Sequence, residues 1–354
     1  MSLRRVKLAF LGDIYLGEQS HFVNEEVCSY LKSCDLVFAN LESPMTDPTS
    51  TPLRKGLNLR AEIDNLVFLH KLSISAVSIA NNHICDWGKE GLQNTLIALE
   101  KDQISHVGAG LTPDQANAPL CFSIGGVRIG IIACGEENIQ TVSATKNGYG
   151  CSCFEPDQIN LRIKELRKKV DFVCLQIHWG LTNYHYPLPE QIQIAHRLIE
   201  GGVDLIIGHH PHVIQGFEQY TDKYIVYSLG NFFFGPYYRN KKMVRLSGEN
   251  YTSMIAIVEV GEKNSYTLRF VHTRQLSPAG PVVLLSKRKR RRREMFLEKL
   301  CNPLCQNNYP LFFKKYVLRR LIWRFIRWMN PANWKNFSKD YFLGLKVAFR
   351  RLIQ

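Results

Sequence analysis

The sequence lacks several features that mark well-defined protein classes. Its ten cysteines include no C-x-x-C pair and several lie in apolar, strand-like runs, a pattern typical of reduced, buried thiols. No segment reaches the roughly 18–20 apolar residues of a membrane span, and the apolar run before Gly12 is too short for a signal peptide. No G-x-x-x-x-G-K-[ST] loop is present, so we expect no ATP-driven ligation by this chain alone. We expect a cytoplasmic protein.

Most of the chain also has little net charge. The formal charge is +14, but residues 287–354 contain 19 Lys and Arg against three acidic residues, which leaves residues 1–286 close to neutral. Seven consecutive basic residues, Lys287–Arg293, are typical of a solvated, mobile segment. The charge pattern therefore predicts a main domain over 1–280 and a basic, amphipathic helical extension over 281–354.

The extension allows more than one interpretation. Residues 314–329 and 339–353 predict two amphipathic helices; the first has Leu318, Leu321, Ile322, Phe325 and Met329 on one face and Arg320, Arg324 and Arg327 on the other. Such helices fit the plane of an anionic membrane surface, or their apolar face packs on the main domain. The basic run would also bind polyanions in a salt-dependent way. Because no recognisable nucleic-acid fold accompanies it, we expect no specific nucleic-acid partner.

The main domain shows the alternation of an α/β protein. Apolar runs such as KLAFLGD, DLVFANLE, DFVCLQIHWG, VDLIIGHHPH and YIVYSLGNF predict strands, and amphipathic stretches between them predict helices over 23–33, 62–73, 89–103, 156–170 and 188–201. The final runs, SMIAIVEV and SYTLRFVHT, follow each other without a helix. They therefore predict an antiparallel edge or a second sheet.

Polar residues able to bind metal follow the carboxyl ends of these strands, where α/β folds place their sites. Alone, each would be read as a helix cap, a turn residue or a satisfied histidine. As an ordered set they indicate a metal site. The six expected ligands are Asp13, Glu42, Asn82, His178, His210 and His212.

The donor types suggest which metals bind and how. Oxygen and nitrogen donors without cysteine favour Mn, Fe or Zn. Two ions would need a bridging carboxylate, for which Glu42 is the candidate. Asp13 and His212 would hold one ion, while the other three would hold the second, with His209 or His210 as the imidazole from the GHHPH segment.

Other residues around these strand ends have expected roles in catalysis and substrate binding. His83, next to the Asn82 ligand, is free to protonate a leaving group as general acid. The residues expected to contact substrate are Asn40, Asn81, Trp179, His209 and Asn231.

The motif order GD, NLE, NNH, HWG, GHHPH and SLGNF resembles the CapA-type family of capsule and poly-gamma-glutamate synthesis proteins, a branch of the calcineurin-like metallophosphoesterase superfamily. The resemblance covers about residues 6–275. It implies a four-layer αββα sandwich, a site for two divalent metal ions and a role in making or handling an anionic cell-surface polymer. The superfamily's Asn-His pair matches Asn82 and His83, its lone histidine matches His178, and its His-x-His matches His210 and His212.

The sequence departs from the superfamily pattern at three positions. The expected Asp-x-His is Asp13-Ile14-Tyr15, which removes one imidazole from the first metal position and predicts weak or single-metal occupancy. Glu42 replaces the bridging aspartate. Ile84 replaces the acid after the Asn-His pair, and Asp86 is the candidate to substitute for it.

These features lead to three functional hypotheses. The first is a metal-dependent hydrolase or phosphoesterase acting on an anionic polymer, a lipid-linked precursor or a phosphorylated substrate such as a metabolite, near the inner face of the membrane. The second is a non-catalytic accessory protein of polysaccharide or poly-gamma-glutamate assembly, which would bind other capsule-assembly proteins. The third is a peripheral membrane or polyanion-binding protein whose function resides in the extension. Many relatives have an amino-terminal membrane anchor; here the extension is the candidate for membrane attachment.

Overall fold

The computed structural model describes residues 5–329 except 18–22, 48–49, 139, 240–241, 245, 247 and 262–264. Two sheets form its centre. The first has eight strands in the order β18-β17-β16-β1-β2-β3-β4, with β13 also paired to β1. Its strands are β1 (Val6–Tyr15), β2 (Leu36–Leu41), β3 (Ala76–Ser78), β4 (Ser105–Val107), β13 (Asn231–Phe234), β16 (Thr252–Val260), β17 (Tyr266–Gln275) and β18 (Val282–Leu284).

The second sheet has six strands in the order β11-β12-β10-β9-β7-β6. They are β6 (Leu120–Ile124), β7 (Val127–Gly135), β9 (Phe172–His178), β10 (Leu205–His209), β11 (Phe217–Tyr220) and β12 (Lys223–Val226). Two short ribbons pair β5 (Ala109–Gly110) with β8 (Gly150–Cys151) and β14 (Tyr238–Arg239) with β15 (Lys242–Met243). The predicted antiparallel edge is confirmed, because β16 pairs antiparallel with both β1 and β17.

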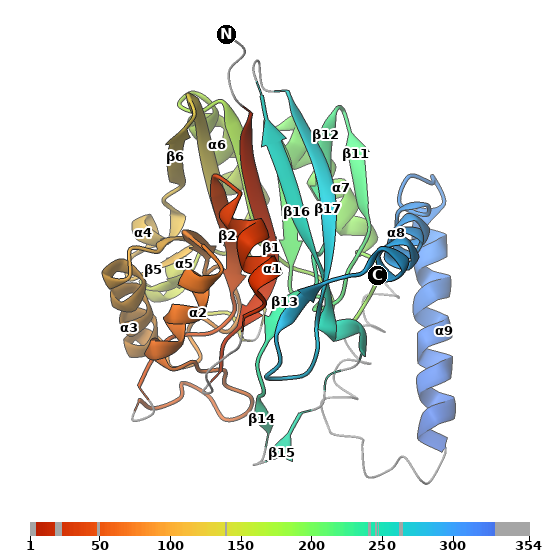
Figure 1. The fold of residues 1–354 in the computed structure, drawn as a ribbon, viewed down its shortest axis with the longest axis horizontal. Helices are drawn as coiled ribbons and strands as arrows, with labels where there is room; N and C mark the ends of the chain where they lie inside the picture. Colours follow the sequence, from red (N-terminus) through yellow and green to blue (C-terminus); the bar gives the residue numbers. More distant parts are fainter. Residues whose placement is uncertain are drawn as a thin grey trace.

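Helices cover the outer faces of both sheets (Figure 1). The predicted helices are confirmed within a few residues at each end. The helices are α1 (Glu25–Lys32), α2 (Leu66–Lys71), α3 (Gly88–Lys101), α4 (Pro113–Asn117), α5 (Ala144–Asn147), α6 (Pro156–Arg167), α7 (Pro189–Glu200), α8 (Lys287–Cys301) and α9 (Tyr309–Met329), with 3-10 turns at Ile63–Asn65 and Gly248–Tyr251. Local signals set several starts: the Asn24 side chain caps α1, and proline opens α6 and α7.

The two faces of β9 show how the layers pack. Phe172 and Cys174 belong to the core cluster that contains β1 and β2 residues, whereas Val173 and Leu175 belong to the cluster that contains α6 and α7 residues. Because side chains alternate along a strand, one face of the second sheet packs on the first sheet and the other packs on helices. The expected four-layer αββα sandwich is therefore confirmed.

Strand β13 was not predicted. The strand expected in the run YIVYSLGNF is present as β12, but the end of the run begins a further strand, β13, in the other sheet. The chain leaves β12 at Val226 and reaches β13 at Asn231 through Gly230, whose φ of 74° is a left-handed conformation that glycine adopts readily. This crossing brings Asn231 beside Asp13.

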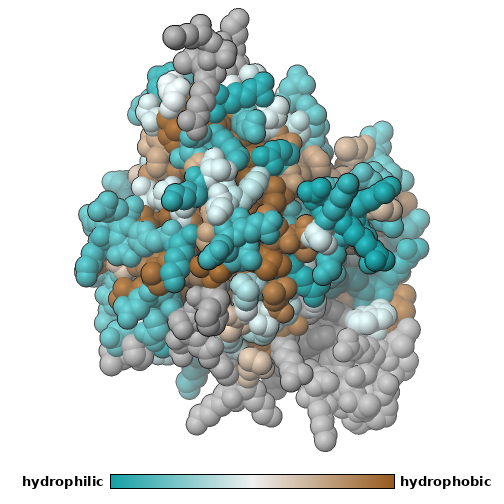
Figure 2. Space-filling view, in the orientation of Figure 1, coloured by the Kyte–Doolittle hydropathy of each residue, from teal (hydrophilic) through white to brown (hydrophobic). Residues whose placement is uncertain are grey.

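The described part of the extension packs on the main domain. The run Lys287–Arg293, expected to be mobile, forms the first turns of α8, and Leu297 and Leu300 of α8 join the first core cluster. Tyr309, Phe313 and Val317 of α9 join the second. Figure 2 shows hydrophilic side chains gathered over α8. The predicted helix 314–329 lies within α9, and the one over 339–353 lies outside the described residues. The domain division stays a prediction.

No helix within the described residues is both long enough and apolar enough to cross a lipid bilayer.

Candidate metal centre

Strand pairing brings the predicted residues together at the carboxyl ends of both sheets. In the first sheet, Asp13 pairs with Asn231 on one side and Asn40 on the other. In the second sheet, His178 pairs with His209. Because the parallel strands of each sheet end at the same edge, residues far apart in sequence form one cluster.

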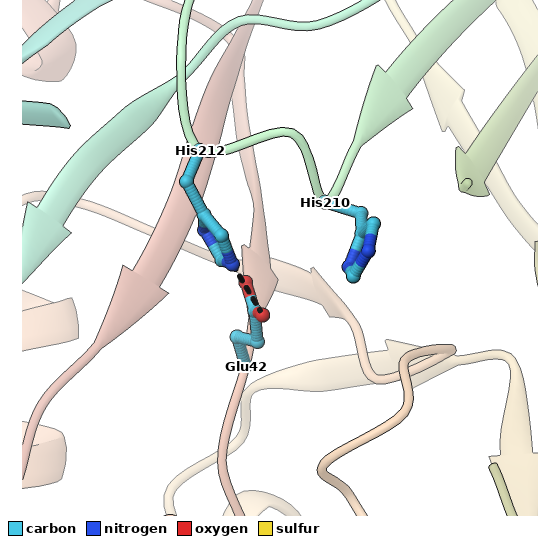
Figure 3. Close-up of side chains that lie close together, drawn as sticks. All are labelled: Glu42, His210 and His212. Atoms are coloured by element: carbon cyan, nitrogen blue, oxygen red, sulfur yellow. Dashed lines mark ion pairs between the residues drawn. The ribbon is translucent and has the colours of Figure 1, made fainter. Parts of the chain in front are cut away.

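Glu42 lies at the centre of this cluster, directly after β2. Its side chain is 0% exposed, and neither carboxylate oxygen has a hydrogen-bond partner. Its Oε1 lies 3.4 Å from His212 Nε2 and 3.8 Å from His178 Nε2. Figure 3 shows His210 and His212 descending from the end of β10 toward Glu42. A carboxylate buried without hydrogen bonds is costly, so this position requires a cation or a proton.

Three further donor atoms converge beside Glu42. His178 Nε2 lies 2.9 Å from Asn82 Oδ1 and 3.0 Å from His210 Nδ1. The single Nε2 proton of His178 can serve only one of these two contacts, whereas one cation can accept lone pairs from all three atoms. The arrangement therefore suits a metal ion.

The turn after β10 holds its histidines in uncommon conformations. His210 has a φ of 94° and His212 a φ of 58°, both in the region that non-glycine residues rarely adopt. Such backbone strain persists where surrounding structure fixes it, often at functional sites. The positive φ angles of His210 and His212 turn both imidazoles toward Glu42.

The donor geometry supports Glu42 as the shared ligand. Ligand atoms of Glu42, His210 and His212 all lie within 4.8 Å of one another, and so do those of Asp13, Glu42 and His178. Glu42 belongs to both groups, as expected of a bridge, but each group joins a residue assigned to the first ion with one assigned to the second. At the position expected for the first ion, His212 Nδ1 lies 2.9 Å from Asn231 Oδ1 and 3.4 Å from Asp13 Oδ2. The other ring nitrogen of His212, Nε2, therefore remains to bind a metal.

Burial and neighbouring charges shift the pKa values of these groups. Burial raises the pKa of Glu42 well above its usual range. Burial opposes ionisation of Asp13, but hydrogen bonds from His209 and His212 bring its pKa well below the usual range. Burial, followed by repulsion from His210, lowers the pKa of His178 well below its usual range.

The pKa values of the two histidines in the turn after β10 shift in opposite directions. Burial and then His212 lower the pKa of His210 to about 3. Burial also opposes protonation of His212, but Glu42 and Asp13 raise its pKa to about 9. At neutral pH His178 and His210 are therefore neutral, the form in which imidazole binds metal.

The predicted general acid, His83, is held by a carboxylate. Its Nδ1 lies 2.7 Å from Asp86 Oδ2, and its backbone N–H donates to Asn81 Oδ1. Asp86 Oδ2 also accepts a 2.7 Å hydrogen bond from the backbone N–H of Leu59. Asp86 thus supplies the acid missing at Ile84, and Nε2 of His83 is left for contact with a leaving group.

A cavity of 190 Å³ opens onto the cluster. Five predicted site residues line it: Asn82, His83, His210, His212 and Asn231. Asp13, Glu42 and His178 are buried next to these residues and do not line the cavity. The cavity therefore gives substrate access to one side of the donor cluster.

Four residues expected to contact substrate lie elsewhere. Asn40 donates to Asp13 Oδ1 at 2.9 Å, and Asn81 donates to the Leu41 carbonyl at 2.8 Å. His209 lies 3.0 Å from Asp13 Oδ1 and, through its other nitrogen, 2.9 Å from Gln176 Oε1. Trp179 is buried and stacks on Tyr227. The first three contact candidate ligands or the backbone beside them, and Trp179 packs in the core. Of the histidine pair, His210 is the one whose ring lies among the candidate ligand atoms.

Sequence reasoning missed two residues that fix ligands. Gln140 Oε1 accepts a 2.9 Å hydrogen bond from Asn82 Nδ2, which orients Asn82 Oδ1 toward His178. Thr182 Oγ1 lies 3.3 Å from His210 Nε2. Gln140 lies in a loop with no motif to mark it. Thr182 follows the HWG motif by two residues, which was the only available signal.

Comparisons with known proteins identify the family of this chain. The family model described as "Bacterial capsule synthesis protein PGA_cap" matches residues 7–236. The "Capsule biosynthesis protein CapA" of Bacillus anthracis is 29% identical over 65% of this chain and 60% of its own length. The "PGA biosynthesis protein CapA" of Bacillus subtilis is 30% identical over 64% of this chain and 62% of its own length. The chain thus spans about three fifths of these relatives.

Solved structures show only a distant likeness. The 5'-nucleotidase precursor of Thermus thermophilus has a TM-score of 0.47 and 15% identity over 79% of this chain and 54% of its own. The NAD nucleotidase of Haemophilus influenzae has a TM-score of 0.44 and 15% identity over 84% and 56%. Similarity at this level adds nothing to what the strand order shows. The family match instead covers well over half of the chain and includes every predicted ligand. The chain belongs to the bacterial capsule synthesis protein PGA_cap family.

Proposed function

We propose that this protein is a metal-dependent hydrolase of the phosphoesterase kind, acting in the biosynthesis or processing of capsule or another anionic cell-surface polymer. The pathway is suggested by the names of the Bacillus relatives. The chemistry rests above all on Glu42, a fully buried carboxylate without hydrogen bonds among imidazole and amide donors.

The donor set fits two divalent ions of Mn, Fe or Zn. Asp13, Glu42 and His212 would hold one, and Glu42 would share the second with Asn82, His178 and His210. Bound ions would polarise a phosphoryl oxygen and activate a water. His83, oriented by Asp86, would give a proton to the leaving group.

The test is turnover of an aryl phosphate monoester and diester by metal-stripped protein, before and after reloading with Mn²⁺ or Zn²⁺. We expect activity only after reloading and its loss in His178→Ala. His70→Ala is the matched control, since His70 is exposed in a surface ion pair with Asp102 and does not line the cavity. Activity that survives both chelation and His178→Ala would contradict the proposal.

The second candidate function is a non-catalytic accessory role in polymer assembly. Two observations favour it: Tyr15 removes an imidazole from the first metal position, and one relative is the "Probable polyglutamine synthesis accessory protein" of Mycobacterium tuberculosis, 28% identical over 56% of this chain. This role would involve capsule-assembly proteins as partners. It predicts that a Glu42→Ala chain still supports polymer production in cells, an outcome that the hydrolase proposal excludes.

We propose a cytoplasmic location, peripheral on the inner face of the membrane, because α9 has a second apolar stripe. While Tyr309, Phe313 and Val317 face the domain, Leu318 and Ile322 are 55% and 50% exposed. Leu311 lies on the same face, and the exposed Lys314, Lys315 and Arg319 flank it. An apolar stripe bordered by cations fits an anionic lipid surface.

Vesicle co-sedimentation of the full chain tests this location. We expect binding to vesicles that contain phosphatidylglycerol, weaker binding to phosphatidylcholine alone, and reduced binding after Leu318→Asn with Ile322→Asn. Leu161→Asn, an equally exposed leucine on α6, is the control. If all variants bind the phosphatidylglycerol vesicles as well as wild type does, the proposal for α9 is wrong.

A further inference from the structure

Part of the cavity lining is apolar. Leu57, Leu59, Phe234, Tyr237 and Leu246 line the cavity beside the polar residues. Together with Tyr15 they form a small cluster of their own, separate from the two main cores. Leu57 and Leu246 are only half-buried, so this cluster keeps apolar surface open to the cavity.

This apolar wall begins at the metal donors. The Phe234 ring lies 5.2 Å from the His212 ring, 5.1 Å from Tyr15 and 5.8 Å from Tyr237. Tyr15 follows Asp13 on β1, and Phe234 follows Asn231 on β13. The strands that deliver polar groups to the centre thus also deliver aromatic rings to the adjoining surface.

The cavity also has a polar lining. Asn183, Asn250 and Gln140 contribute to it, and Asn250 Nδ2 donates to Asn183 Oδ1 at 2.8 Å and to the His212 carbonyl at 2.9 Å. A ligand in this cavity therefore meets both amides and hydrocarbon. Ligand sites commonly combine an apolar lining with a few placed polar groups.

The size of the cavity limits what it can enclose. A cavity of about 150 Å³ lined by apolar side chains admits benzene. With 190 Å³ here, there is space for one small ring or a few methylene groups next to the donors. Anything longer must extend past the rim.

We propose that the site selects phosphoesters of an apolar alcohol, with the phosphoryl group at the metal donors and the first ring or methylene groups of the alcohol against Leu57, Tyr237 and Leu246. This inference rests on the proposed function. The reaction is hydrolysis: the oxygen of water bonds to phosphorus, the bond from phosphorus to the alcohol oxygen breaks, and a proton from His83 neutralises the departing alkoxide. His83 lines the same cavity as the wall, as this step requires.

A matched pair of substrates tests the inference. n-Pentyl phosphate and 2-ethoxyethyl phosphate have alkyl chains of equal length, but an ether oxygen replaces one methylene in the second. With metal-loaded wild type we expect kcat/KM to favour the pentyl ester about tenfold, since burying an ether oxygen without a partner is unfavourable.

Variants of the wall should remove this preference. In Leu57→Asn and in Leu246→Asn the ratio of kcat/KM should fall toward one, while both esters are still hydrolysed. Leu53→Asn is the control, because Leu53 belongs to the same loop as Leu57 but is exposed and does not line the cavity. It should keep the wild-type ratio.

The outcomes separate this inference from the proposed function. If wild type hydrolyses both esters equally well, the inference is wrong and the hydrolase proposal stands. If neither ester is hydrolysed, the hydrolase proposal fails, and titration calorimetry of the two esters with metal-loaded protein decides the inference. About tenfold tighter binding of the pentyl ester that is lost in Leu57→Asn supports the apolar subsite, whereas equal affinities overturn it.

Discussion

Asp204 and Glu42 are both fully buried acids, but they lie at opposite ends of the parallel strands. Asp204 directly precedes β10. Its carboxylate bonds Arg167 Nη1 at 2.5 Å and the backbone N–H of Val173 at 2.8 Å, and it also pairs with Lys223. Glu42 directly follows β2 and has no hydrogen-bond partner at either oxygen.

The difference shows which end of the sheets is built for stability and which for binding. The charge of Asp204 is balanced by cations from the chain itself, so its burial costs little and ties β10 to neighbouring elements. Around Glu42 the neighbours are histidines and an amide, which are metal ligands. Without a metal, a proton held by His212 or by Glu42 itself balances this carboxylate, and a bound cation would take the place of that proton.

The largest expected effect is on turnover in Glu42→Gln. Loss of the shared ligand removes several kcal/mol of transition-state stabilisation, so activity should fall about a thousandfold or more. Since burial favours the neutral acid, metal-free Glu42→Gln and metal-free wild type should have free energies of unfolding within about 1 kcal/mol of each other. Steady-state kinetics and denaturant unfolding provide both numbers. A large loss of stability would make Glu42 structural, like Asp204.

Asp204→Asn should show the reverse. Removing one partner of a buried ion cluster costs about 3 kcal/mol of unfolding free energy, at the lower end of the usual range because Arg167 and Lys223 are partly exposed. Metal content per folded molecule should not change. Urea unfolding and metal analysis of the same sample check this, and metal loss without destabilisation would refute the contrast.

Gln140→Ala should have an intermediate effect. Without the hydrogen bond that orients Asn82, affinity for the metal should fall about 10–100-fold, with activity recovering at saturating metal. Metal titrations monitored by activity measure the shift, and Gln193→Ala on the exposed face of α7 is the control. Unchanged affinity would mean that Gln140 does not position Asn82.

The smallest effect concerns an exposed ion pair between Arg128 and Asp171. Hydrogen bonds from Arg128 lower the pKa of Asp171 to about 2. Because the folded pKa is depressed, the pair stabilises the fold above the unfolded pKa near 4, and that contribution disappears as the pH falls toward 2. Thermal unfolding of Asp171→Asn should show only a small loss at pH 7 and none near pH 2, since exposed pairs contribute little. A loss of stability at pH 7 as large as that of Asp204→Asn would contradict the expected difference between an exposed and a buried ion pair.

Much of the candidate metal centre was readable from sequence, because strand ends are local features. Apolar runs located the carboxyl ends of β1, β2, β9 and β10, and the candidate ligands lie at or next to these ends. The direction of side chains was not readable: His209 ends β10 and His210 follows it with a positive φ, which sequence patterns do not reveal.

Contacts between residues distant in sequence also could not be predicted from sequence patterns. Gln140 meets Asn82 across 58 residues, and Asp204 meets Arg167 across 37. Trp179, next to a ligand in the chain, points into the core because successive side chains alternate beyond the end of a strand. The inner face of α9 depends on Tyr309 and Phe313, which precede the helix predicted at 314.

The most direct measurement is Mn²⁺ binding by wild type, Glu42→Ala and Asp204→Asn. Titration calorimetry gives the affinity, and metal analysis after dialysis gives the stoichiometry. We predict that wild type and Asp204→Asn bind the ion with the same stoichiometry and that Glu42→Ala loses it. Binding by Glu42→Ala at wild-type affinity and stoichiometry would contradict the assignment of Glu42 as the central ligand.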